Sequence, residues 1–412
     1  MHRSLAKPHY ILLTGAAFLL PATSINYPSI FYPVAALLTL FSLVSCGLTR
    51  FELNLKKEEL ILLTPWFFYP AVVFIDMYFR QQNWVWGQFQ ESSRFLLVIC
   101  IFFLVRQYGF NVVAMRWGVW CGAVGAGCWA YYQKNTLGIG RVWGGTSSLI
   151  NAFGDISLLL GILSLVLFQP KWRADKRWLA VAFIALLIGM FGSLASGAKG
   201  GWISLPVITW FLVDLFDKPS WRKRIALLVT LTVSATLVFY FSPFIQSRVS
   251  MVIPAILQYA QTGEVFDGSV GIRIALWHSS WLIFLQHPWF GTGIGSFYPQ
   301  LLLLVENGLI DPAASQIHHP HSQFFSSIAA YGVFGPLSIF SIYISFIWYC
   351  KIHISQHKSL AIAGVITAVA YMDFGLVEMI WDINNAGVLF VMMMALITGQ
   401  LSHQARTKNL DT

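Results

Sequence analysis

The sequence predicts an all-α polytopic membrane protein with about twelve transmembrane helices and one large outer loop that contains helices. Of the 412 residues, 10% are charged and 57% are hydrophobic, whereas about a quarter of a typical soluble domain is charged. Apolar runs of about 20 residues, the length that crosses a bilayer as a helix, recur along the whole chain. Composition and pattern together exclude soluble multidomain enzymes, disordered scaffolds and secreted disulfide-rich modules.

Twelve apolar runs give the predicted helices. They centre on Tyr10–Tyr27, Ser29–Leu48, Leu60–Ile75, Phe95–Val105, Trp117–Tyr132, Ile150–Phe168, Leu179–Leu194, Trp202–Leu215, Ile225–Phe241, Phe324–Trp348, Leu360–Met372 and Ala386–Leu401. The first run follows Arg3 and Lys7. We expect it to be an uncleaved span rather than a signal peptide, because the second run follows almost at once.

The basic residues indicate the orientation of these helices. If the N-terminus is cytoplasmic, 19 of the 26 Lys and Arg residues fall in the termini and the even-numbered connections, as the positive-inside rule requires. We therefore expect both termini in the cytoplasm, and we attribute the net charge of +9 to membrane orientation rather than to nucleic-acid binding. Seven basic residues fall on the outer side: Arg80, Arg94, Lys134, Arg141, Lys199, Arg248 and Arg273. Four of them stand beside helix ends and are expected to extend to lipid headgroups, namely Arg80, Arg94, Lys134 and Arg248.

The chain divides into three parts. Residues 1–241 hold the first nine predicted helices, residues 242–321 form the one long connection, and residues 322–412 hold the last three helices and a cytoplasmic tail. Because the cytoplasmic connections are all short, chemistry that needs space outside the membrane is expected in the long connection. The five cysteines form no C-x-x-C pair or His/Cys cluster, so neither a disulfide nor a metal site is expected there.

Two glycine-rich turns on the outer side place a cation just before a predicted helix. Lys199 lies in Ser-Gly-Ala-Lys-Gly-Gly-Trp at residues 196–202, and Arg141 lies in Gly-Ile-Gly-Arg-Val-Trp-Gly-Gly at residues 138–145. Glycines allow close backbone approach, and the unpaired amides of a helix start attract anions, so each turn is a candidate anion site. The alternatives are an ordinary helical hairpin with a snorkelling lysine, and a loop that is only flexible.

A third cation begins an aromatic helix face in the long connection. Arg273, Trp277 and Trp281 are spaced i, i+4 and i+8, so they share one face of a helix. With Arg273 in the first turn, the helix dipole is expected to strengthen its attraction for an anion. The alternative is an interfacial helix whose aromatic side chains rest among headgroups, and the two roles are compatible. The Gly-Thr-Gly-Ile-Gly turn at residues 291–295 follows no strand, so it does not indicate a dinucleotide site.

Histidines concentrate in His-His-Pro-His at residues 318–321. His321 is the candidate general base, because a neutral imidazole accepts a proton near neutral pH. His318, His319 and Trp277 are secondary candidates. The histidines lack the i, i+4 spacing of a helical zinc pair, so no metal is expected. The alternative is a histidine at headgroup level without a chemical role.

Carboxylates supply the rival bases. Four lie in the long connection, where solvation of the loop is their simpler role: Glu264, Asp267, Glu306 and Asp311. Three carboxylates outside this set lie near the outer ends of the last two helices: Asp373, Glu378 and Asp382. We expect these three to cap helices rather than to orient the basic cluster or bind sugars.

The order of these parts resembles the O-antigen ligases and the related O-antigen polymerases and bacterial O-oligosaccharyltransferases. The resemblance covers residues 138–335 and the number of helices. Its motifs are, in chain order, Gly140–Gly144, Ser196–Trp202, Gly271–Trp277, His287–Phe297, His321–Phe325 and Gly332–Gly335. Two positions depart from the family pattern. Lys199 stands where arginine is usual and loses the bidentate fork, and Ser322 stands where asparagine is common.

The resemblance implies a GT-C-like glycosyltransferase of the bacterial inner membrane that works without a metal or another cofactor. Such an enzyme transfers a finished polysaccharide from undecaprenyl pyrophosphate to lipid A-core on the periplasmic face, with inversion at the anomeric carbon. On this sequence it implies His321 and Arg273 as catalytic residues, and Arg141, Lys199 and Arg273 as ligands of the pyrophosphate. The residues agree with this reaction, since an acceptor hydroxyl needs a base and a pyrophosphate leaving group needs cations.

Three other functions stay open. An O-antigen polymerase uses a second repeat unit as acceptor, but such polymerases tend to have two sizeable outer loops, and here only residues 242–321 form one. A protein O-oligosaccharyltransferase differs only in its acceptor, which the sequence does not identify. A twelve-helix transporter is disfavoured, because the two halves show no repeat and the outer basic residues cluster at one face rather than at mid-depth.

Overall fold

The computed structural model describes residues 2–48, 54–80, 86–146, 149–198, 200–215, 220–266 and 269–410, and all regular elements in these ranges are helices. Eight helices in these ranges are long and apolar enough to cross a membrane: α2 (Pro28–Leu48), α3 (Lys57–Arg80), α6 (Ile150–Leu167), α8 (Arg177–Ser196), α10 (Trp221–Phe241), α16 (Phe334–Ile352), α17 (Lys358–Val377) and α18 (Asn384–Leu410). Three further helices are of similar length: α1 (His2–Thr23), α4 (Trp86–Tyr108) and α5 (Val112–Asn135). The all-α polytopic membrane fold is confirmed.

Small residues allow close helix packing. Gly118 and Gly122 on α5 face α1, where an added Cβ would lie 2.2 Å from the Phe18 carbonyl oxygen and 2.3 Å from that of Pro21. This small-xxx-small spacing brings membrane helices together where lipid weakens the hydrophobic drive for association. In contrast, α10 has no buried residue along its described length. An apolar helix exposed on every side is stable only against lipid.

Two of the predicted helices are wrong in detail. The run expected from Phe324 to Trp348 is two helices, α15 (Gln323–Tyr331) and α16. The two helices are separated at Gly332, which has a φ of +59°. A Cβ added to Gly332 would lie 2.4 Å from the Pro288 carbonyl oxygen. The run expected from Trp202 to Leu215 is broken into η1 (Gly200–Trp202), α9 (Leu205–Leu212) and η2 (Val213–Leu215). Since a helix rises 1.5 Å per residue, α9 spans only about 12 Å and cannot cross the hydrocarbon core.

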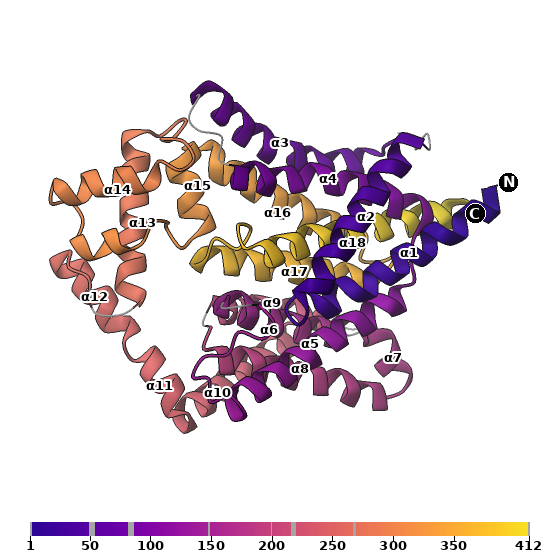
Figure 1. Ribbon diagram of the computed structural model, residues 1–412. Helices are drawn as coiled ribbons and strands as arrows, with labels where there is room; N and C mark the ends of the chain where they lie inside the picture. Colours follow the sequence, from indigo (N-terminus) through magenta and orange to yellow (C-terminus); the bar gives the residue numbers. More distant parts are fainter. Residues whose placement is uncertain are drawn as a thin grey trace.

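The long connection is helical. It contains α11 (Pro243–Val249), α12 (Val252–Thr262), α13 (Ser269–Gln286), α14 (Phe297–Glu306) and η3 (Pro312–Gln316). Figure 1 shows α11 to α14 along one edge of the molecule, at the end opposite the two termini. The short helix α7 (Gln169–Ala174), which holds Lys171 and Arg173, lies at the end of the termini. At the other end, α13 and α17 both pack against α15.

Candidate active site

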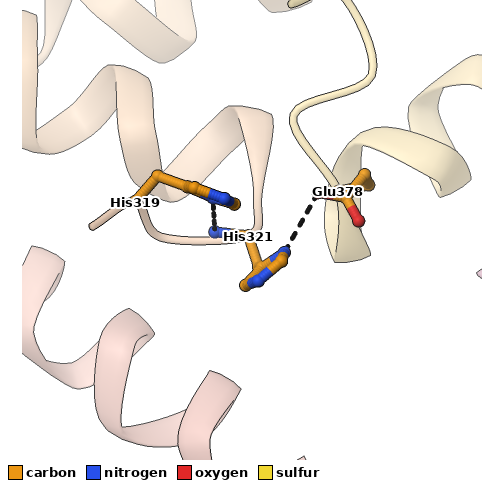
Figure 2. Close-up of side chains that lie close together, drawn as sticks. All are labelled: His319, His321 and Glu378. Atoms are coloured by element: carbon orange, nitrogen blue, oxygen red, sulfur yellow. Dashed lines mark hydrogen bonds and ion pairs between the residues drawn. The ribbon is translucent and has the colours of Figure 1, made fainter. Parts of the chain in front are cut away.

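His321 and Glu378 meet at the end of the bundle opposite the termini. His321 lies just before α15, and Glu378 directly follows α17. Their side chains are joined by a hydrogen bond of 3.0 Å between His321 Nδ1 and Glu378 Oε1, which Figure 2 shows together with His319 from the same loop. The main chain ties the two segments as well, since the Gln323 amide donates to the Glu378 carbonyl oxygen at 3.2 Å. The start of α15 and the end of α17 therefore hold the side chains of His321 and Glu378 against each other.

The charge on Glu378 fixes which nitrogen of His321 holds the proton. Burial opposes ionisation of Glu378, but hydrogen bonds from His321 and Asn151 and the charge of Arg273 outweigh it and lower the pKa to about 2. An ionised carboxylate can only accept hydrogen bonds, so Nδ1 of His321 must be the donor. In a neutral imidazole, Nε2 then has the free lone pair and can accept a proton.

The backbone of His321 is strained. Its φ is +50°, and among the described residues it is the one non-glycine residue with a positive φ. A left-handed conformation costs an L-residue about 1 kcal/mol or more, and such strain is concentrated at functional sites. The next residue, Ser322, is buried, caps α15 and donates its hydroxyl to the Gly375 carbonyl oxygen at 3.1 Å. The cap and the Glu378 contacts therefore hold His321 in this conformation.

Two arginines flank the pair. Arg141 donates to the Ser196 carbonyl oxygen at 2.9 Å and to the Asn151 side-chain oxygen at 3.3 Å. Asn151 in turn donates to Glu378 Oε2 at 3.0 Å. Arg273 on α13 lies 3.9 Å from the same carboxylate oxygen. The structure thus brings together His321, Arg141 and Arg273, the three described residues of the predicted main site.

Two cavities adjoin this cluster and share Arg141 and Asn151. The larger has a volume of about 550 Å³ and is also lined by His319, His321, Glu378 and Asp382. The smaller has a volume of about 170 Å³ and is also lined by Asp155, Gly197, Gly200 and Arg273. The imidazole therefore faces the larger space, Arg273 faces the smaller one, and Arg141 contacts both. This arrangement suits a reaction in which an anionic group and a hydroxyl compound meet beside a base.

Part of the chain is similar to a known family of proteins. Residues 184–340 match the family model described as O-antigen ligase. The chain therefore carries an O-antigen ligase domain at residues 184–340, which supports assignment to the O-antigen ligase superfamily. At this level the domain and the apolar helices support a multi-pass membrane transferase of the ligase and polymerase type, with a role in lipopolysaccharide synthesis. The match includes Arg273 and His321, whereas Arg141 and Glu378 lie outside it and are brought to the site by the fold.

A protein of Haemophilus influenzae described as uncharacterized is also similar to this chain. The two are 22% identical over 346 residues, which cover 82% of this chain and 85% of that protein. The similarity therefore extends well beyond the matched domain and includes most of the membrane helices.

The helix α13, which lies in the matched domain, differs in part from the prediction. Its described residues begin at Ser269, so Arg273 lies beyond the first turn and the dipole argument for Arg273 is wrong. Trp277 stacks on Phe325 of α15, with ring centroids 5.4 Å apart and planes at 8°. Trp281 is exposed. Trp277 therefore packs α13 against α15, which positions Arg273 near Glu378.

The glycine-rich turn at residues 196–202 is held by two buried carboxylates. Asp155 on α6 accepts the Gly201 amide at 2.9 Å, and Asp373 on α17 accepts the Ser204 amide at 2.7 Å. Asp155 was not among the predicted site residues, although an acidic residue inside an apolar run is a signal for a special role. Asp373 was expected to cap a helix, but it lies inside α17 and binds the turn instead. Lys199 lies outside the described residues, so its role stays a prediction.

The other two histidines of the cluster differ in their surroundings. His319 Nδ1 accepts the His321 amide at 3.3 Å, and the two imidazole centroids are 4.2 Å apart. Burial, followed by the neighbouring His321, lowers the pKa of His319. The His318 ring packs on the Tyr298 ring, with the two ring centroids 4.0 Å apart. His319, His321 and Glu378 each offer a metal-ligand atom, and these atoms lie within 4.8 Å of one another.

The expected role of Glu378 is wrong. Glu378 is the C-cap residue of α17, but its side chain binds His321 and Asn151 and pairs with Arg273, so it does orient the basic cluster. Asp382 also does more than end a helix, because it lines the larger cavity. Burial raises the pKa of Asp382 to about 6.

The described rival bases do not line either cavity. Asp311 accepts the amides of Val265 and Ala313 at 2.7 and 2.8 Å, so it caps η3 and ties it to the loop. Glu264 and Glu306 are exposed, and Asp267 lies outside the described residues. Loop solvation and capping account for the three that are described.

Two arginines expected at the headgroups bind inside the protein instead. Arg80 pairs with Asp76 at 2.6 Å and donates to the carbonyl oxygens of Phe290 and Gly291. Arg94 donates to the Trp381 carbonyl oxygen at 3.1 Å and to the Asn384 side chain. These bonds attach the loops on either side of the site to α3 and α4. Lys134 is exposed at the end of α5, and the side chain of Arg248 lies outside the described residues.

Proposed function

We propose that the protein transfers a glycan from undecaprenyl pyrophosphate to a sugar hydroxyl of lipid A-core. The main support is a single cavity in which an imidazole, oriented by an ionised carboxylate, stands beside Arg141 with Arg273 next to it. Transfer from a pyrophosphate carrier requires a base for the acceptor hydroxyl and fixed cations for the leaving group, and both are present.

In this reaction Nε2 of His321 takes the proton of the acceptor hydroxyl while that oxygen attacks C1 of the donor sugar. The bond between C1 and the pyrophosphate oxygen breaks on the opposite face, so the anomeric configuration inverts. The carrier pyrophosphate leaves with the negative charge, which Arg141 and Arg273 neutralise, with Lys199 as a further cation. The imidazolium formed on His321 lies against Glu378 and returns its proton to solvent.

We place the reaction on the periplasmic side of the inner membrane. The cluster lies at the end opposite the termini, and α7 with its basic residues lies at the end of the termini. Basic residues favour the cytoplasmic side, so this arrangement supports cytoplasmic termini and a periplasmic site. A polyprenyl carrier can then stay in the outer leaflet while its pyrophosphate reaches Arg141 and Arg273.

Lipid A-core is the proposed acceptor because one long connection, rather than two, borders the site. The carboxylate of Asp382 in the larger cavity is suited to accept hydrogen bonds from sugar hydroxyls. A second repeat unit, as in a polymerase, or a protein hydroxyl, as in protein O-glycosylation, would meet the same base.

The test is transfer by the purified protein in lipid nanodiscs, with carrier-linked glycan, lipid A-core and a metal chelator. We expect lipid A-core to be glycosylated and His321→Ala to reduce the rate by about 100-fold or more. Parallel reactions offer a carrier-linked repeat unit or a serine-containing peptide as acceptor. A His321→Ala protein that transfers at the normal rate would sink the mechanism, and transfer only to the repeat unit would reassign the protein as a polymerase.

A further inference from the structure

The cluster of His319, His321 and Glu378 has the ligand types of a transition-metal site. Two imidazole nitrogens and a carboxylate oxygen are typical zinc ligands in proteins, and here the three ligand atoms lie within 4.8 Å of one another. The sequence pattern does not bring Glu378 to the histidines, because Glu378 lies 57 residues after His321. All three side chains line the cavity of about 550 Å³, so an ion can reach them from solvent.

The distances require only a small adjustment to hold Zn²⁺. With zinc–ligand bonds of about 2.0–2.2 Å, the ligand atoms of a tetrahedral site stand about 3.3 Å apart. His321 Nδ1 and Glu378 Oε1 are already 3.0 Å apart. Because the ligand atoms lie within 4.8 Å of one another, the His319 ring must move closer by about 1.5 Å at most. This movement gives up the 3.3 Å hydrogen bond that His319 accepts from the His321 amide. Asn151, bonded to the other oxygen of Glu378, would orient this ligand from the second shell.

We propose that Zn²⁺, or a similar borderline dication, binds His319, His321 and Glu378 and inhibits transfer. The inhibitory part rests on the proposed function, whereas binding of the ion does not. A neutral imidazole has one proton and one free lone pair. If the metal takes Nδ1 of His321, the remaining proton moves to Nε2 and that nitrogen can no longer accept the hydroxyl proton. If the metal takes Nε2, it occupies the lone pair directly, so the base is lost in both cases.

The neighbouring charges determine how tightly Zn²⁺ is expected to bind. Glu378 is the one carboxylate of the three ligands, and Arg273 lies 3.9 Å from it. The arginine repels a dication, so we expect micromolar rather than nanomolar affinity. Mg²⁺ prefers six oxygen ligands in an octahedron and is expected neither to bind this cluster nor to inhibit.

The experiment measures Zn²⁺ binding and transfer on the same full-length protein in nanodiscs. Isothermal titration is expected to give one Zn²⁺ per chain, with nitrogen ligands seen by X-ray absorption at the zinc edge. Saturating Zn²⁺ is expected to lower the transfer rate more than about tenfold, and a chelator to restore it. His319→Ala removes one ligand without removing the base, so the inhibitory Zn²⁺ concentration should rise at least about tenfold. His287→Ala removes an exposed imidazole outside the cluster and should leave that concentration unchanged.

Each outcome separates the two proposals. Absence of stoichiometric Zn²⁺ binding, or equal inhibition of the wild type and His319→Ala, overturns the zinc site. Transfer that depends on Zn²⁺ overturns its inhibitory role. A chelated protein that binds Zn²⁺ normally but transfers no glycan leaves the zinc site standing and contradicts the proposed function. If His319→Ala does not fold, His319→Gln makes the same comparison with less loss of volume.

Discussion

Replacement of Glu378 by glutamine tests whether the carboxylate acts through His321. The side chain keeps its size and an oxygen that can accept from Nδ1, but it loses its charge. The contacts of the folded site lower the Glu378 pKa from 4.5 to about 2, and at 1.36 kcal/mol per tenfold change in the acid constant this is worth about 3 kcal/mol. Burial opposes this shift, so the contributions of His321, Asn151 and Arg273 together are at least that large. If the contact with His321 accounts for about half of these roughly 3 kcal/mol, loss of the charge slows proton transfer about tenfold. If the contact accounts for all of this energy, the rate falls about 200-fold.

The assay is steady-state transfer with the acceptor concentration varied. We expect Glu378→Gln to lower kcat by between about tenfold and 200-fold while the KM for the acceptor changes little, because the interaction lost strengthens as the imidazolium forms. Glu264→Gln makes the same chemical change at an exposed loop position and should stay within about twofold of the wild type. A Glu378→Gln protein with an unchanged kcat, or with the whole loss in KM, would refute the argument that Glu378 orients and charges the base.

Three further outcomes follow from the geometry. Arg273→Ala should lower kcat/KM for the donor by about 10- to 100-fold, as expected for a lost charge-assisted contact. Arg273→Lys should recover part of this loss, because the point charge remains. An unchanged kcat/KM in initial-rate assays would exclude Arg273 from the donor site. Because the Asp382 pKa is raised from 3.8 to about 6 in the folded protein, ionisation of Asp382 costs stability that grows as the pH rises through this window. Thermal unfolding should therefore show Asp382→Asn gaining stability over the wild type between about pH 4 and about pH 7. A difference that is constant with pH would contradict this. Gly291→Ala should lower the free energy of unfolding by about 2 kcal/mol or more. Gly291 has a φ of +59°, and an added Cβ would lie 2.4 Å from the Ala330 carbonyl carbon. An unchanged melting temperature would show that the turn can move.

The long helices could be predicted from the sequence because a bilayer leaves the backbone few alternatives. Each buried peptide group needs an internal partner, so apolar runs of about 20 residues become helices. The breaks could not be predicted this way. Gly332 interrupts an apolar run only because the Pro288 carbonyl oxygen lies where a Cβ would be, and that neighbour comes from another segment.

The candidate site shows the same division. His321, Arg141 and Arg273 stood out because their charge or basicity on the outer side had no explanation in topology. Glu378 looked like a helix cap, since a carboxylate beside a helix end has that role often, and its contact with His321 depends on how α17 meets α15. Arg80 and Arg94 looked interfacial for a similar reason, yet their partners Phe290 and Asn384 lie 210 and 290 residues away.

The buried acids explain how irregular backbone is tolerated beside the site. Non-helical segments at membrane depth are stable only where protein groups satisfy their amides. Between α8 and α9 the Gly201 amide is bound by Asp155 and the Ser204 amide by Asp373. These carboxylates take the place of the intrahelical partners that a continuous helix would provide, so α9 can stay short and the glycine turn can line the smaller cavity next to Arg273. The break that the apolar pattern concealed is therefore the feature that borders the smaller cavity, where the proposed function needs space for an anion.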